Sequence, residues 1–236
     1  MRKAEEAQDV TDLIKPSSLA ATLDNISDAL FFGRRLSKQD RAAAARWIAA
    51  RQGMPRSYNG MFAPTDYDFR HWPRVFTGEQ LGSNAATAHI LSQEACRALL
   101  LLDARSTAVD TALASATGSF VALQREHEPR RPGFWCCGTC TASLWRHLAA
   151  GGLDDPEKRL ASGLRYMRTM RDGKGRWKRF PFHYSLLALS DFDTRAALGE
   201  LRYAAAAAER SLQREKGRGK HARRRRAVLE RVLAKC

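Results

Sequence analysis

The sequence predicts an all-α protein, built as an α/α-toroid-like or solenoid array of helix pairs in a single domain. Two observations lead to this prediction. The first is an internal repeat: a Gly-x-Trp motif at 133–135 recurs at 175–177, 42 residues later, and a Ser-Leu pair at 143–144 recurs at 185–186 with the same offset. The second is that stretches with helical periodicity fill most of the chain. Helix pairs repeating at this period are typical of proteins in which neighbouring pairs stack.

The individual helices are expected from the spacing of apolar residues and from capping side chains. Ser37 stands before an apolar-periodic stretch, where its hydroxyl can accept from free amides of the first turn. Ser83 or Asn84 is expected to do the same for a later helix. The expected helices are residues 23–32, 38–51, 85–102, 107–124, 141–148, 155–171, 184–190, 194–213 and a short one at 227–233.

Three consecutive segments are expected along the chain, and the second contains a long loop. Residues 1–22 have weak periodicity and are predicted to be a flexible N-terminal arm, followed by the helical-repeat domain at 23–213 and a basic C-terminal tail at 214–236. Inside the domain, residues 53–84 carry three prolines, four glycines and six aromatic residues. An irregular connection of this length predicts a lid-like or binding loop. The alternative is that its aromatic side chains simply pack the loop onto the helices.

Composition limits the function classes. The chain has 236 residues and a net charge of +15, and residues 214–226 alone hold eight Lys or Arg side chains and one acid. Arg223, Arg224, Arg225 and Arg226 are the candidate residues for binding nucleic acid or another polyanion, although no aromatic residue interleaves with them. Five cysteines, three of them crowded together, argue against a disulfide framework. With no signal peptide and no apolar run long enough to span a membrane, we expect a cytoplasmic protein.

Cysteines in the central stretch indicate a candidate metal site. Cys137 and Cys140 have the spacing that lets two thiolates reach one zinc ion from a turn. No second pair exists, so histidine would have to complete the site; the repeat favours His183 over His147, which lies about 10 Å further along the Cys140 helix. The alternative is a metal-free set of buried cysteines packed under Trp135.

The same stretch resembles a known group of enzymes. Residues 140–145, read together with 182–190, are similar to the inner-helix repeats of protein prenyltransferase β-subunits and the related terpene cyclases. The resemblance covers residues 85–193 and implies an α/α toroid with a catalytic zinc bound by Cys140 and His183. Where that family has an aspartate, this chain has Gly138, so Cys137 would take its place. Residues 135–138 are also similar to a Trp-Cys-x-Gly motif of lanthipeptide cyclases, another toroid family.

The resemblance implies a zinc-dependent transferase or cyclase acting on an apolar, isoprenoid-type small molecule. Trp135, Phe182 and Tyr184 would line an apolar cavity, and Lys178 and Arg179 would neutralise a diphosphate leaving group. A cyclase would instead need a proton-donating acid. The acid pairs at hand are Asp66 with Asp68, and Asp191 with Asp193.

Two other classes are compatible with the sequence. A non-catalytic, basic helical-repeat scaffold would explain a zinc motif that is incomplete. A nucleic-acid-binding or polyanion-binding protein would explain the basic C-terminal segment.

Overall fold

The computed structural model describes residues 13–127 and 133–236. Within them the chain is entirely helical, with no β-strand and only two isolated bridges, Gln52 with Phe62 and Arg171 with Trp177. The all-α prediction is therefore confirmed. No helix among the described residues is long and apolar enough to cross a membrane. The helices are α1 (Leu19–Phe31), α2 (Lys38–Ala49), η1 (Tyr58–Gly60), α3 (Asp66–His71), α4 (Asn84–Leu102), α5 (Thr107–His127), α6 (Gly138–Ala149), α7 (Pro156–Thr169), α8 (Phe182–Ser190), α9 (Arg195–Arg214) and α10 (Lys220–Leu233).

The helices pack into two compact units. Unit 1 comprises the described residues up to Pro73 together with 80–120, and unit 2 comprises 74–79 and the described residues from Val121 onward. The stretch expected as one domain, 23–213, is thus divided between two packing units. The short segment 74–79 is part of unit 2 although its sequence neighbours belong to unit 1.

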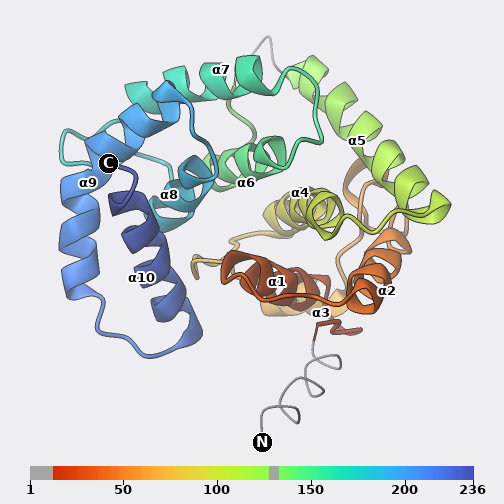
Figure 1. Ribbon diagram of the computed structural model, residues 1–236. Helices are drawn as coiled ribbons and strands as arrows, with labels where there is room; N and C mark the ends of the chain where they lie inside the picture. Colours follow the sequence, from red (N-terminus) through yellow and green to blue (C-terminus); the bar gives the residue numbers. More distant parts are fainter. Residues whose placement is uncertain (1–12, 128–132) are drawn as a thin grey trace, which may run out of the picture. The chain divides into compact units, whose positions relative to one another are not determined.

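Unit 1 is assembled around α4, against which α1, α2 and α3 pack (Figure 1). Twelve of the nineteen residues of α4 are buried, so this helix forms the centre of the unit's core. Ser83 caps α4 and Ser37 caps α2, each accepting a backbone N–H of the first turn, as predicted. The loop at 53–84 is not irregular throughout, because it contains η1 and α3. Met61 and Phe62 from this loop are fully buried.

A buried carboxylate joins two helices of unit 1. Asp68, in α3, is 1% exposed and accepts hydrogen bonds from the hydroxyl of Ser18 at 2.5 Å and from the N–H of Leu19 at 3.0 Å. These groups form the N-terminus of α1, where free N–H groups and the helix dipole favour a negative charge. Asp68 also accepts from the N–H of Thr65 at 2.8 Å, which closes the capping box of α3 itself.

Unit 2 is built around α8, which packs against α6, α9 and α10 (Figure 1). Eight of the nine residues of α8 are buried. Helix α6 is almost as deeply buried, whereas α7 and α9 bury only one face and pack against each other. Unit 2 therefore contains two successive pairs, α6 with α7 and α8 with α9, in which a buried helix is followed by an amphipathic one.

The two Gly-x-Trp motifs occupy equivalent places in these pairs. Gly133 precedes α6 and lies so close to α7 that a Cβ atom on it would meet the backbone N of Gly163 at 2.1 Å. Gly175 precedes α8 and lies against α9, where a Cβ atom would meet the Ala207 Cβ at 2.9 Å. Both glycines have positive φ, which other residues rarely adopt. The sequence repeat thus corresponds to a structural repeat within unit 2.

A second buried carboxylate links the helices of unit 2. Glu200, on α9, is 0% exposed and accepts from Arg168 at 3.1 Å, Arg171 at 2.9 Å and the indole N–H of Trp177 at 2.9 Å. Trp177 belongs to the second Gly-x-Trp motif, so this one carboxylate joins the loop before α8 to α7 and α9. A buried charge of this kind is stable because the two guanidinium groups and the indole N–H donate to it.

The segment expected to be a basic tail is folded over most of its length. Helix α10 spans fourteen residues, seven more than the short helix predicted at 227–233. It packs on α8 and α9 through Val228, Leu229 and Val232, each 0% exposed. These three residues lie in the predicted part of the helix, whereas the basic residues at 220–226 concealed its first half from the sequence pattern. The predicted arm at 1–22 lies largely outside the described residues.

We expect Glu200→Ala to lower the free energy of unfolding by about 3 kcal/mol. Removing one partner of a buried ion pair costs about 3–5 kcal/mol, and the lower end applies because Arg168 and Arg171 are 55% and 32% exposed and can return to water. Denaturant unfolding followed by circular dichroism measures the loss. The control is Glu209→Ala on the exposed face of the same helix, expected to change stability by less than about 0.5 kcal/mol. Equal losses in the two variants would contradict this role for Glu200.

Asp68→Asn is expected to loosen the start of α1. The amide would turn a donor toward N–H and O–H groups that now donate to the carboxylate, at a cost of about 1–3 kcal/mol. Hydrogen exchange of the amides of residues 19–22 should speed up in this variant. Asp66→Asn is the matched control, because Asp66 is 74% exposed and pairs with the exposed Arg56. Unchanged exchange in Asp68→Asn would show that the N-terminus of α1 does not depend on this carboxylate.

Candidate metal centre

Three cysteines gather at the start of α6. Cys137 is the N-cap residue of this helix, and its sulfur accepts the backbone N–H of Cys140 at 3.5 Å. Gly138 follows, and only glycine fits there, because a Cβ atom would meet the carbonyl oxygen of Arg179 at 2.0 Å. The start of α6 is therefore pressed against the chain that leads into α8, and this contact fixes the position of the cysteines.

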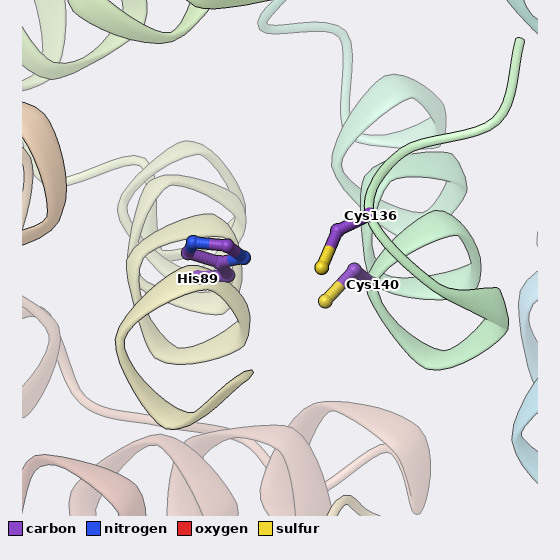
Figure 2. A group of neighbouring side chains, drawn as sticks. All are labelled: His89, Cys136 and Cys140. Carbon is purple, nitrogen blue, oxygen red and sulfur yellow. The ribbon is translucent and has the colours of Figure 1, made fainter. Parts of the chain in front are cut away.

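Cys136 completes the group through an unusual backbone. Its φ is 53°, in the left-handed region that non-glycine residues seldom occupy and that costs free energy. The exposed Cys136 side chain and that of Cys140 project in the same direction, and the two sulfur atoms lie within 4.8 Å of each other (Figure 2). Cys140 is 0% exposed and lies at the inner side of the group.

The thiols share hydrogen bonds, and one of them is favoured as the thiolate. Hydrogen bonds from Cys136 and Cys140 lower the pKa of Cys137 to about 2, and the backbone N–H of Cys140 adds to this effect. The same contacts raise the pKa of Cys140, and burial raises it further. A negative charge on Cys137 is also stabilised by the N-terminus of α6. These contacts favour the thiolate at Cys137 over a thiolate at Cys140.

The structure brings together two of the three predicted zinc ligands. Cys137 and Cys140 lie in one group, but among the described residues His183 belongs to no cluster that could share an ion with them. Helices α6 and α8 do pack side by side, as the repeat predicted. However, the His183 side chain points to α9, where its Nε2 lies 3.0 Å from the hydroxyl of Ser211. The repeat predicted the helix position correctly and the direction of the side chain wrongly. Cys136, next to this pair in the sequence, is not among the three predicted ligands.

The residues predicted to bind an apolar substrate belong mainly to the core. Tyr184 is 0% exposed, Trp135 5% and Phe182 8%. The cavity beside Trp135 has a volume of about 20 Å³, room for one water molecule and far less than an isoprenoid chain needs. Its lining includes Gln124, His127, Phe134, Leu144 and Arg159. Lys178 and Arg179 are exposed, and neither lines this cavity.

The two predicted acid pairs are used in the fold. Asp68 caps α1 and α3, as described above. Asp191 lies 3.3 Å from the guanidinium of Arg146 and 3.2 Å from that of Arg231. Asp193 pairs with Lys235 at 2.7 Å, which lowers its pKa. An acid with a lowered pKa is a poor proton donor, so Asp193 is unsuited to the role that a cyclase would require.

Three of the four arginines proposed for polyanion binding make contacts inside unit 2. Arg224 is 2% exposed, and its guanidinium lies 4.3 Å from the ring centre of Phe76. Arg225 pairs with Glu215 at 2.6 Å, and Arg226 donates to the carbonyl of Gly217 at 2.7 Å. Arg223 is exposed. These contacts hold α10 to the segments before it.

Comparison of the chain with protein-family models, with curated proteins and with solved structures finds no match. The functional inferences below are drawn from the residues of this chain.

In protein treated with a chelator, Cys137 is expected to react with iodoacetamide at about pH 6, where ordinary thiols are protonated. Its lowered pKa keeps the thiolate present as the pH falls. Cys236 is the internal control, because burial raises its pKa and its reaction should slow about tenfold for each pH unit below neutrality. Mass spectrometry of peptides at several times gives both rates in one sample. Parallel pH profiles for the two cysteines would contradict the assignment.

Proposed function

We propose that Cys136, Cys137 and Cys140 form a zinc-thiolate centre in a helical-repeat protein of the α/α-toroid type. The main support is that three thiols lie together at the start of α6 and that Cys137 is favoured as the thiolate. Thiolates, not thiols, bind zinc, and a low pKa reduces the cost of deprotonation. Two of the ligands are those predicted from the sequence, and Cys136 takes the place of His183.

The geometry of the thiols fits a zinc ion. Zinc–sulfur bonds of about 2.3 Å at tetrahedral angles place two sulfur atoms about 3.8 Å apart. The sulfurs of Cys136 and Cys140 lie within 4.8 Å, so a side-chain shift of about 1 Å brings them to this spacing. The strained backbone of Cys136 supports the proposal, because strain at one residue is retained where its position serves a function.

Three protein ligands are typical of a zinc ion that takes part in chemistry. A tetrahedral ion with three thiolates keeps its fourth position for water or a substrate, where it acts as a Lewis acid or lowers the pKa of the bound group. The exposed Cys136 places this position within reach of solvent.

The toroid part of the proposal is supported by the structural repeat of α6–α7 and α8–α9. In each pair a buried helix follows a Gly-x-Trp motif whose glycine rests on the amphipathic helix. Such pairs are the building unit of toroids and solenoids. The resemblance to prenyltransferases adds a transferase or cyclase as the reaction class. The cavity at Trp135 does not hold an isoprenoid chain, so we propose the metal centre without an isoprenoid pocket.

Protein purified without chelators is expected to contain about one zinc per chain, with tight binding that depends on all three cysteines. Elemental analysis should show near-complete loss of zinc in Cys137→Ala and Cys140→Ala, and weaker binding in Cys136→Ala. Cys96→Ala and Cys236→Ala are the controls, because one thiol is buried in unit 1 and the other is at the C-terminus.

Cobalt substitution tests the number of thiolate ligands. The intensity of the sulfur-to-cobalt absorption in the near ultraviolet scales with the number of bound thiolates, so Cys136→Ala should reduce it by about one third. An absence of metal in the wild type, together with a failure of the reduced protein to bind cobalt, would overturn the proposal. A disulfide between Cys137 and Cys140 in freshly isolated protein would do the same and point to redox chemistry.

A further inference from the structure

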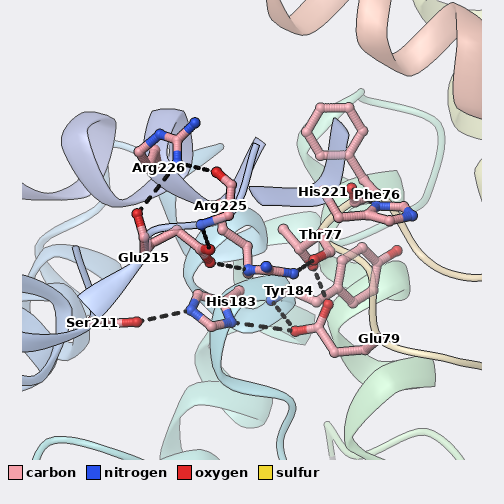
Figure 3. Close-up of polar contacts among 11 residues, drawn as sticks. Phe76, Thr77, Glu79, His183, Tyr184, Ser211, Glu215, His221, Arg225 and Arg226 are labelled. Atoms are coloured by element: carbon pink, nitrogen blue, oxygen red, sulfur yellow. Dashed lines mark hydrogen bonds and ion pairs between the residues drawn. The ribbon is translucent and has the colours of Figure 1, made fainter. Parts of the chain in front are cut away.

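A serine, a histidine and a glutamate from three separate segments meet in unit 2 (Figure 3). His183 lies in the first turn of α8, Ser211 near the end of α9, and Glu79 at the end of the segment 74–79. The Nε2 of His183 is 3.0 Å from the Ser211 hydroxyl oxygen, and its Nδ1 is 4.0 Å from Glu79 Oε1. Each ring nitrogen therefore faces a different partner, in the order that nucleophilic serine chemistry requires.

Glu79 is held in place by hydrogen bonds from groups other than His183. Its Oε1 accepts the backbone N–H of Tyr184 at 3.1 Å, and its Oε2 accepts the hydroxyl of Thr77. The Tyr184 N–H belongs to the first turn of α8 and has no acceptor within the helix, and the helix dipole there stabilises a carboxylate. The segment that carries Glu79 is itself anchored, because the Thr77 carbonyl accepts from Arg225 at 3.2 Å.

The surroundings favour a neutral imidazole on His183. Burial lowers its pKa, and the positive charges of Arg225 from α10 and Arg176 from the loop before α8 lower it further. The carboxylates of Glu79 and Glu215 act in the opposite direction but are outweighed. In the tautomer that directs Nδ1–H at Glu79, Nε2 carries the lone pair that faces the Ser211 hydroxyl. The site is reachable from solvent, since the side chain of His183 is 21% and that of Glu79 27% exposed.

We propose that Ser211, His183 and Glu79 form a second site, which hydrolyses carboxylic esters. Ser211 is the nucleophile, His183 the general base, and Glu79 the positioning residue that orients the imidazole and balances its charge. The distance of 4.0 Å between His183 Nδ1 and Glu79 Oε1 must shorten to that of a hydrogen bond when His183 takes up a proton. Catalytic hydrogen bonds commonly shorten in this way when the free enzyme forms the reacting complex.

The reaction proceeds in two balanced steps. Ser211 Oγ bonds to the carbonyl carbon of the ester while its proton passes to His183 Nε2, and the alcohol leaves with that proton as the C–O bond breaks. Water then gives a proton to Nε2 and attacks the acyl carbon, the bond to Ser211 Oγ breaks, and the proton returns to Oγ. The guanidinium of Arg225, held by Glu215 beside His183, supplies positive charge for the oxyanion (Figure 3).

A fluorophosphonate probe tests the proposal, because activated serines displace its fluoride and become phosphonylated. We expect one label per chain on Ser211, none in Ser211→Ala, and labelling slowed at least 100-fold in His183→Gln. Ser162→Ala is the matched control: Ser162 is a half-buried serine on α7 that bonds to Arg165 and has no histidine partner, so its loss should leave labelling unchanged. Hydrolysis of p-nitrophenyl acetate should follow the same order.

The Glu79→Gln variant tests whether Glu79 assists the reaction as a positioning residue or only stabilises the fold. The amide still accepts from Tyr184 but cannot balance the imidazolium, so labelling should slow at least 10-fold and the pH at half-maximal rate should move. Circular dichroism of each variant checks that unit 2 stays folded. No label on the wild type, or equal labelling in wild type and His183→Gln, would overturn the proposal. The probe reports on Ser211 and elemental analysis reports on zinc, so failure of this site and failure of the metal centre are distinguishable.

Discussion

Unit 2 depends on burying a helix that is too short to be stable by itself. Helix α8 has nine residues, fewer than an isolated helix needs in water, so its stability comes from packing against α6, α9 and α10. Burial creates a second requirement, because the free N–H groups at its start have little access to water. Pro181 stands at the N-cap and offers no side-chain acceptor, and Glu79 supplies one from 105 residues away in the sequence. The core and the polar network around His183 therefore result from the same burial.

Local sequence signals predicted most of the helices because these signals are themselves local. The caps at Ser37 and Ser83 act on amides within the next turn, and apolar spacing reports on one helix at a time. Helix α3 was missed because it has only six residues. The first half of α10 was missed because its basic residues hide the apolar face. The division into two units was missed as well, since no local pattern records that residues 74–79 pack with a distant segment.

The candidate sites, too, could be predicted from the sequence only where the signal is local. Cys137 and Cys140 could be found from their spacing, which places them on one turn of one helix. The direction of the His183 side chain could not be found, because it depends on which face of α8 meets α9. Ser211 belongs to no sequence motif, because it lies in an ordinary amphipathic helix. Glu79 lies in the loop at 53–84, which was interpreted from its aromatic residues and not from its acids. Tertiary packing brings these residues together, and the periodicity and spacing of a sequence do not report it.

The position of residues 74–79 also limits how the chain can be taken apart. A fragment that starts at Val121 would contain α6 to α10 and most of the core of unit 2, yet it would lack Glu79 and the Thr77 carbonyl that accepts from Arg225. The start of α8 would then lose its acceptor, and the Phe76 ring under Arg224 would be gone. Unit 2 is therefore a packing unit but not a separable piece of sequence, and gene truncation at the apparent boundary would yield an incomplete fold.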